Sequence, residues 1–198
     1  MTERASAIGA VLAGGRSRRM GRPKALVELA GRPLISYPLA AVEAAKLEPV
    51  VVAKPDSPLP PLGCRVVREP VEPAHPLRGI LSALDGSGGR AVIVLGCDMP
   101  LVAPSLLAWL AGLDAPAAIP CVGGRLEPLL ARYEPAVAGP LAAALERRAP
   151  LQEAVSALDP SLLAEPELTR FGDPELTCLN VNTRRDLERA ASVIGKGG

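Results

Sequence analysis

The amino-acid sequence predicts an α/β protein in which a mostly parallel, partly mixed sheet lies between two layers of helices. Short apolar runs alternate with segments of helical periodicity, and neither an internal repeat nor a long linker interrupts the 198 residues. The clearest runs are apolar at every position, which is typical of parallel strands covered on both faces. We therefore expect a single three-layer α/β/α domain, Rossmann-like in architecture, over residues 1–198.

The expected strands follow from the apolar runs and the glycines or prolines that end them. The first covers residues 7–12 and the clearest covers 91–96. The others cover 50–52, 65–68, 117–122 and 126–133, with a shorter one at 24–29. Gly123 and Gly124 join two of these strands, and this turn makes the sheet partly mixed.

The expected helices lie between these strands. They cover residues 33–46, 77–84 and 104–110, a series broken by prolines over 135–163, and a last helix over 184–194. Thr183 is placed to cap the last helix, and Asp186 three residues later completes a variant of the capping box.

Composition excludes several classes of function. A formal net charge of +1 argues against a protein that coats nucleic acid, which would be markedly basic. No apolar run reaches the length of a membrane span and the first residues lack a signal-peptide pattern, so we expect a cytoplasmic protein with neither nucleic-acid nor membrane partners. The four cysteines form no C-x-x-C pair, which disfavours zinc and disulfide frameworks.

Ligands of such sheets bind beyond the carboxyl ends of the strands, which directs attention to the loop from Leu12 to Lys24. Gly14 and Gly15 allow backbone N–H groups to converge on an anion, and four arginines and Lys24 supply positive charge for a triphosphate. The loop lacks the spacing of a Walker A motif and of a dinucleotide fingerprint. The alternative is a glycine-rich surface turn with solvated arginines.

Two further polar elements follow predicted strands. Asp98 ends the strand at 91–96, where its carboxylate could hold Mg²⁺ against phosphate oxygens or could simply cap a turn. Asn180 and Asn182 are the two asparagines of the chain, and a spacing of two places them on one face of an extended segment. Asn182 or Thr183 could alternatively serve only as the cap of the last helix.

The loop resembles a known family. Its Leu12-Ala13-Gly14-Gly15-x-Ser17-x-Arg19-Met20-Gly21-x-x-Lys24-Ala25-Leu26 pattern is similar to the signature of nucleotidyltransferases related to the molybdenum cofactor guanylyltransferase. The family usually has Asp before the lysine, where this chain has Pro23. The Cys97-Asp98-Met99-Pro100 and Asn180-Val181-Asn182-Thr183 elements match in order, so the resemblance extends over nearly the whole chain.

The resemblance implies a role for each matched residue. Leu12, Ala13, Gly14, Gly15, Lys24, Glu69 and Asp98 would bind the nucleotide, partly through backbone N–H groups of residues 13–15. Lys24, Asp98 and Arg19 would be catalytic, Asp98 would hold the Mg²⁺ cofactor, and Asn180 and Asn182 would bind the acceptor or orient the waters of the metal.

Two matches are weaker. His75 stands where the family has the first glycine of its G-P-L-x-G-I loop, and we expect an exposed histidine without a catalytic role. Glu127 to Tyr133 resembles the family's P-L-x-A-x-Y strand, for which we expect a mainly structural role, although its edge could face the second substrate.

The implied reaction joins GTP to molybdenum-loaded molybdopterin and forms the guanine dinucleotide cofactor and pyrophosphate. Residues 1–100 would bind the nucleotide and residues 101–198 the acceptor. The chain would be a monomer or weak oligomer with transient contacts to proteins that insert molybdenum.

Other functions remain open from the sequence. Cytidylyl transfer to molybdopterin is one, although Gly15, Asn180 and Asn182 resemble the guanylyl family more. Transfer to another phosphorylated acceptor such as a sugar phosphate is a second. A non-catalytic GTP-binding partner protein is a third.

Overall fold

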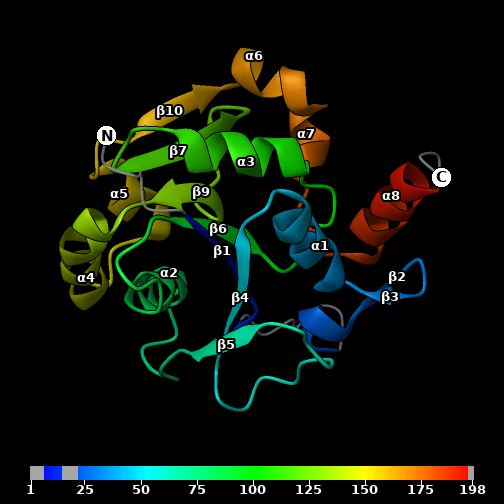
Figure 1. Cartoon of the computed structure of the whole chain (residues 1–198), viewed down its shortest axis with the longest axis horizontal. Helices are drawn as coiled ribbons and strands as arrows, with labels where there is room; N and C mark the ends of the chain where they lie inside the picture. The colour runs from blue at the N-terminus through cyan, green and yellow to red at the C-terminus, as the bar shows by residue number, and fades with distance from the viewer. Residues whose placement is uncertain (1–6, 15–21, 196–198) are drawn as a thin grey trace.

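A sheet with helices on both faces forms the centre of the molecule (Figure 1). The computed structural model describes residues 7–14 and 22–195. The predicted fold class is confirmed, because strands and helices alternate along the chain and most neighbouring strands are parallel.

The main sheet contains β1 (Ile8–Leu12), β4 (Glu48–Ala53), β5 (Arg65–Arg68), β6 (Val92–Gly96), β7 (Ala117–Val122), β8 (Arg125–Leu126), β9 (Leu130–Tyr133) and β10 (Ser161–Ala164). A separate hairpin pairs β2 (Glu28–Leu29) with β3 (Arg32–Pro33). The α-helices are α1 (Ser36–Ala44), α2 (Pro76–Asp85), α3 (Pro104–Gly112), α4 (Ala138–Glu146), α5 (Leu151–Ser156), α6 (Glu165–Leu168), α7 (Pro174–Thr177) and α8 (Arg184–Ile194). The 3₁₀ helices are η1 (Lys24–Leu26), η2 (Pro135–Val137) and η3 (Thr169–Phe171).

The strand order is β10-β7-β9-β6-β1-β4-β5, with β8 paired to β7. Strand β1 is parallel to both β4 and β6, whereas β9 is antiparallel to both β6 and β7. After β6 the chain passes to β7 and then returns β9 into the gap between them. The turn before β9 consequently lies beside the end of β6, where the N–H of Gly96 donates to the carbonyl of Leu129 (2.9 Å).

Alternate residues of the central strands pack into two separate cores. On one face Val11 and Val51 contact the cluster that includes α1 and α3, and on the other Ala10 and Val50 contact the cluster that includes α2 and α4. All four residues are fully buried. Burial on both faces explains why these strands are apolar at every position.

A third, smaller core joins the N-terminal hairpin to the last helix. Its buried members are Val27, Leu29, Leu34, Val181 and Ala190. Figure 1 shows α8 beside β2 and β3. This cluster brings the chain around residue 24 next to the chain around residue 182.

The predicted strand at 24–29 is wrong in its first half, where η1 is followed by the short strand β2. Ala30 and Gly31 have positive φ values of 48° and 76° and form a tight turn. Because Arg32 and Pro33 then pair back with β2, helix α1 begins at Ser36 rather than at Pro33.

Three other expectations need correction. The strand at 126–133 is interrupted, because a turn at Glu127 divides it into β8 and β9. Residues 161–164 form strand β10 rather than helix, since they pair in parallel with the exposed edge of β7. The segment before Asn180 is helix α7 instead of a strand, because the Asp173 side chain accepts from the backbone of Glu175 and caps it.

The last helix follows the prediction. It starts after Thr183, whose hydroxyl oxygen accepts from the N–H of Asp186 (3.2 Å). The Asp186 carboxylate accepts in return from the N–H of Thr183 (2.8 Å). Within residues 7–14 and 22–195, no helix has both the length and the apolar character needed to cross a membrane.

Candidate active site

The end of β1 carries the first part of the predicted phosphate loop. The Leu12 carbonyl accepts from the N–H of Cys97 (3.1 Å), and the N–H of Ala13 donates to the carbonyl of Val52 (2.8 Å). Because the Ala13 amide is already paired, it is not the free phosphate donor that we expected. Two predicted residues of this loop lie outside the described part of the chain: Gly15 and Arg19.

Glu69 follows β5, and its carboxylate lies against two glycines. A Cβ atom on Gly14 would lie 1.9 Å from Oε1, and one on Gly79 of α2 would lie 3.2 Å from Oε2. Only 7% of Glu69 is exposed. Burial raises the pKa of its carboxyl group, and the nearby charges of Lys54 and Arg78 offset part of that rise. Glycine at both positions is thus what leaves room for this carboxylate.

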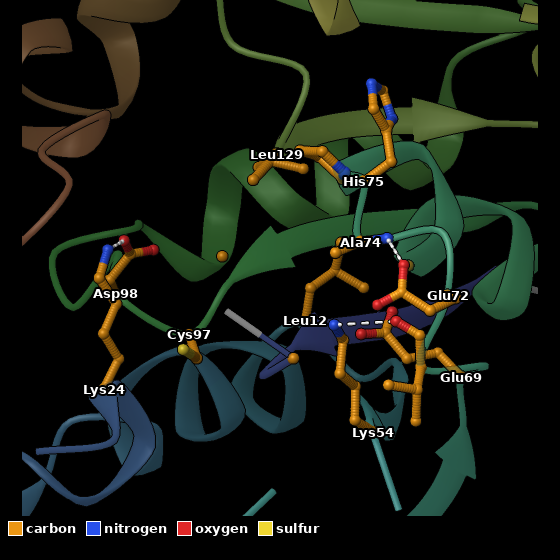
Figure 2. A pocket seen from close by; sticks show the side chains of 15 residues that line it. Leu12, Lys24, Lys54, Glu69, Glu72, Ala74, His75, Cys97, Asp98 and Leu129 are labelled. Carbon is orange, nitrogen blue, oxygen red and sulfur yellow. Dashed lines mark hydrogen bonds and ion pairs between the residues drawn. The ribbon is translucent and has the colours of Figure 1, made fainter. Parts of the chain in front are cut away.

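A cavity of about 460 Å³ lies at the carboxyl ends of β1 and β6 and at the start of α2 (Figure 2). Figure 2 shows Lys24 and Asp98 at one end of it and Glu69 and Lys54 at the other. The Lys54 ammonium group donates to the carbonyl of Val71 (3.3 Å). Charged groups at both ends and apolar side chains between them suit an elongated polar ligand such as a nucleotide.

Lys24 meets two other predicted residues at one end of this cavity. Its ammonium group is ion-paired with Asp98 Oδ2 and also donates to Asn182 Oδ1 (2.6 Å). The side chains of Lys24 and Asp98 are 18% and 12% exposed. Residues from the beginning, middle and end of the chain therefore converge on one point.

Backbone contacts hold Asp98 in this position. The N–H of Val181 donates to the Asp98 carbonyl (2.8 Å), which joins the C-terminal segment to the end of β6. A Cβ atom on Gly96 would lie 2.5 Å from Asp98 Oδ1, so glycine at 96 lets the carboxylate fold over the strand end. Burial raises the pKa of the neighbouring Cys97 thiol to about 12, which makes it a packing residue, as predicted.

The two asparagines have different partners. Asn182 contacts Lys24, whereas the side-chain amide of Asn180 donates to the Cys178 carbonyl (3.1 Å) and lowers the pKa of the Glu127 carboxyl group. The Asn182 side-chain amide donates to the Asn180 carbonyl (3.4 Å). The two asparagines therefore lie close together but contact different groups.

His75 is half-buried and serves as the N-cap of α2, which corrects the expectation of an exposed loop residue. Its Nδ1 accepts from the N–H of Leu77 (3.2 Å). A ring nitrogen that accepts this bond cannot carry a proton at the same time, so the capping role needs the neutral imidazole.

In residues 7–14 and 22–195, no group of three or more His, Cys, Asp or Glu side chains could hold a metal ion. The oxygen atoms of Asp98 and Asn182 nevertheless converge on one cationic group, the Lys24 ammonium. Oxygen donors of this kind suit Mg²⁺, which is bound by one or two protein groups together with water and phosphate oxygens.

Residues 9–161 match the model of the MobA-like NTP transferase domain. The match covers more than half of the chain. The chain belongs to the MobA-like NTP transferase family. It is therefore a nucleotidyltransferase.

Curated relatives agree with this membership over almost the whole chain. A molybdenum cofactor guanylyltransferase of Cereibacter sphaeroides is 35% identical over 200 residues, which cover 96% of this chain and 97% of the relative. A probable molybdenum cofactor guanylyltransferase of Chloroflexus aggregans is 36% identical over 203 residues and covers 94% of each chain. A third, from Pelotomaculum thermopropionicum, is 31% identical and covers 93% of this chain and 91% of its own.

Solved structures show the same architecture. Molybdopterin-guanine dinucleotide biosynthesis protein A of Archaeoglobus fulgidus superposes with a TM-score of 0.80 and 28% identity, over 95% of this chain and 98% of that one. A 2-C-methyl-D-erythritol 4-phosphate cytidylyltransferase of Thermus thermophilus superposes with a TM-score of 0.70 at 20% identity, over 96% and 98%, and shows the fold alone.

Two further polar residues of this MobA-like domain lie near the site, and Lys54 was not predicted from the sequence. Lys54 lines the cavity, and its place directly after β4 is a signal that could have revealed it. Glu127 lies near Asp98 and Asn180. The sequence indicated only that the edge of this segment could face the second substrate, because its place beside the end of β6 follows from the return of β9 into the sheet.

Proposed function

We propose that the chain transfers GMP from GTP to the terminal phosphate of molybdenum-loaded molybdopterin, which forms the guanine dinucleotide cofactor and releases pyrophosphate. The observation that carries this proposal is the meeting of Lys24, Asp98 and Asn182 at the end of a nucleotide-sized cavity. Relatives that match more than 90% of the chain carry the name guanylyltransferase, which supports the choice of nucleotide.

The reaction needs little acid–base chemistry. A phosphate monoester with a second pKa of about 6 is largely dianionic at neutral pH and can attack without a general base. One of its oxygens bonds to the α-phosphorus of GTP as the bond to the β-phosphate oxygen breaks, and that electron pair leaves with pyrophosphate. Repulsion between two anions is therefore the main barrier.

Lys24 and Asp98 address this repulsion. The Lys24 ammonium would neutralise negative charge on the α-phosphate and the leaving pyrophosphate as it develops. Asp98 would hold Mg²⁺, with Asn182 beside it, and the ion when bound would supply Lewis-acid stabilisation of the phosphates. We also propose that the Arg19 side chain and the backbone N–H groups of Gly14 and Gly15 bind the triphosphate.

Glu69 is the proposed contact to the base. Its carboxylate lies at the opposite end of the cavity from Asp98 and can accept hydrogen bonds from two adjacent N–H groups. Guanine presents such a pair on its Watson–Crick edge, whereas cytosine presents only one donor group there. This chemistry favours GTP over CTP, and Leu12 would pack against the base or ribose.

The predicted division of the chain extends this proposal. Apart from Leu129, the residues that line the cavity lie between Leu12 and Asp98, which supports a nucleotide-binding half at 1–100. Asn180 and Asn182 belong to the other half, 101–198, which we propose for acceptor binding. We also propose cytoplasmic action as a monomer or weak oligomer, with transient contacts to proteins that insert molybdenum.

Pyrophosphate release tests the proposed function. The enzyme would be incubated with Mg²⁺, molybdenum-loaded molybdopterin and either GTP or CTP, with controls that lack the pterin. We expect release with GTP that depends on the pterin. Release with CTP instead would assign cytidylyl transfer, and release only with a panel of sugar phosphates would assign another acceptor. GTP binding without release under any condition would identify a non-catalytic binder.

A further inference from the structure

A carboxylate and an amide lie beside Asp98 but outside the lining of the nucleotide cavity. These are Glu127, in the turn before β9, and Asn180, in the segment between α7 and α8. Backbone hydrogen bonds place both segments at the end of β6, since the N–H of Gly96 donates to the carbonyl of Leu129 in the Glu127 turn and the N–H of Val181, next to Asn180, donates to the carbonyl of Asp98. The Asn180 amide and the charge of Asp98 both act on the pKa of Glu127. Both residues therefore extend the polar surroundings of Asp98 with groups that do not line the cavity.

The backbone of Glu127 is firmly held. Its N–H donates to the Pro120 carbonyl and its carbonyl accepts from the N–H of Leu130, both at 2.9 Å. The next residue, Pro128, is buried and accepts a hydrogen bond from the buried hydroxyl of Tyr133 (3.0 Å). A side chain on so constrained a turn is preorganised for a ligand.

The electrostatic setting leaves the carboxylate able to bind. Burial raises the pKa of Glu127, the charge of Arg125 and the hydrogen bond from Asn180 lower it, and Asp98 raises it further. Within the described part of the chain, no lysine or arginine nitrogen lies within 4 Å of this carboxylate, in contrast to Glu134 with Arg132 on the same hairpin. Each carboxylate oxygen accepts more than one hydrogen bond, so the bond from Asn180 leaves capacity for a ligand.

We propose that Glu127 recognises the pyrimidine edge of the acceptor's pterin ring and that Asn180 positions its carboxylate. A 2-amino-4-oxo pterin presents a ring N–H and an amino group side by side, and one carboxylate can accept from both. This inference rests on the proposed function for the identity of the acceptor. It assigns Glu127 a specificity role and gives Asn180 an indirect one.

The location agrees with the geometry of the transfer. In an in-line displacement the attacking and leaving oxygens lie on opposite sides of the phosphorus. Glu69 is across the cavity from Asp98, whereas Glu127 does not line the cavity and its turn is hydrogen-bonded to the end of β6 through Leu129. An acceptor bound at Glu127 therefore reaches the α-phosphate from outside the cavity, without displacing the base.

Binding of two simple probes tests the inference. The fluorescence of 6-hydroxymethylpterin phosphate and of the corresponding lumazine phosphate, which has a carbonyl in place of the 2-amino group, would be titrated with enzyme. We expect the wild type to prefer the pterin about tenfold or more, since hydrogen bonds to a charged group are among the stronger ones. Glu127→Gln should abolish or reverse this preference, because an amide can donate to the lumazine carbonyl.

Controls separate recognition from folding. Glu153→Gln makes the same chemical change on the exposed face of α5 and should keep the wild-type ratio. Asn180→Ala should reduce the preference without reversing it. A Glu127→Gln enzyme that weakens both probes equally, or keeps the wild-type ratio, would overturn the proposal, as would a wild type that prefers neither probe.

Steady-state kinetics keep this inference distinct from the proposed function. Glu127→Gln should raise the KM for molybdopterin about tenfold while the KM for GTP stays within about twofold of the wild type. Selective pterin binding by a wild type that releases no pyrophosphate from GTP would reject the guanylyl transfer but support Glu127. A rise in the KM for GTP instead would place Glu127 in the nucleotide site and reject the inference.

Discussion

The proposed nucleotide end and the proposed acceptor end of the candidate site are built in different ways. The nucleotide end uses the carboxyl ends of parallel strands β1 and β6 and the start of α2, with Glu69 directly after β5. The acceptor end uses the turn before the antiparallel strand β9 and the irregular segment between α7 and α8. Asp98 belongs to both, because it lies two residues after the end of β6 and its carbonyl accepts from the N–H of Val181.

This difference teaches that the two ends depend on different kinds of contact. The nucleotide end rests on the two large cores that cover the sheet. The asparagine segment of the acceptor end rests on the small third core, which joins Leu34 and Val181 across most of the sequence. The turn before β9 packs with the large cores instead. Substitutions at the shared residues should therefore affect catalysis most, and those at the anchor of the last helix least.

Asp98→Asn should have the largest effect, because it removes the charge shared by both ends. We expect at least a 10³-fold loss of kcat with the fold intact, since an amide replaces a group that would hold Mg²⁺. Pyrophosphate release over a magnesium titration measures this. Asp85→Asn, at the exposed end of α2, is the matched control. Wild-type turnover and magnesium dependence in Asp98→Asn would contradict the metal assignment.

Lys24→Met should have the second largest effect. We expect kcat to fall about 10²–10³-fold, because the mutation removes a charge-stabilising group. The change also leaves the partly buried Asp98 and Asn182 without their ammonium partner, so the midpoint of thermal unfolding should fall. Lys46→Met, at an exposed position after α1, makes the same substitution away from the site. Equal losses in both variants would show that Lys24 has no special role in transfer.

Glu69→Gln should affect only the nucleotide end. We expect the Kd for GTP to rise about tenfold, because the amide cannot accept from both donors of guanine, while the KM for the acceptor stays constant. Calorimetric titration with GTP measures the change. Unchanged GTP affinity would move the base contact to another residue.

Protonation of the Glu69 carboxylate should also appear in the pH dependence of GTP binding. The pKa of Glu69 is raised by burial, so protonation on acidification begins above the ordinary value of 4.5. GTP affinity should weaken as pH falls into this range and should stay flat in Glu69→Gln. The stability of the free wild type should decrease as pH rises between the unfolded and the raised folded pKa, because only the folded state still binds the proton there. Parallel profiles for both proteins would contradict this assignment.

Thr183→Ala should have the smallest effect. Loss of the N-cap costs about 1 kcal/mol of stability, as measured by urea unfolding. Burial alone would raise the pKa of Asp186, but hydrogen bonds from the Thr183 hydroxyl and from the N–H groups of Asn182 and Thr183 lower it. The mutation removes one of the groups that hold the Asp186 carboxylate, which also accepts from the N–H of Asn182. We therefore expect only a severalfold decrease in kcat. Thr169→Ala, which removes a hydroxyl bonded to Pro166, is the control.

The amino-acid sequence by itself determined the central strands and the position of Asp98 near the end of one of them. The apolar runs at 91–96 and 50–52 predict β6 and β4 because burial on both faces requires apolar residues at every position. Asp98 comes two residues after such a run, so its place at the sheet edge could be derived without a structure. The resemblance of the loop and of the asparagine element added the family, which the comparisons confirm.

The tertiary structure decided what joins these parts. The contact between Lys24 and Asn182 depends on the third core. The members of this core come from both ends of the chain, and no local sequence pattern indicates that they pack together. The position of Glu127 depends on the insertion of β9 between β6 and β7, since pairing partners far apart in the chain are selected by packing rather than by local propensity. Residues up to Leu163 were predicted as helix because the local sequence does not reveal their pairing partner. Pairing with β7 makes Ser161–Ala164 the strand β10.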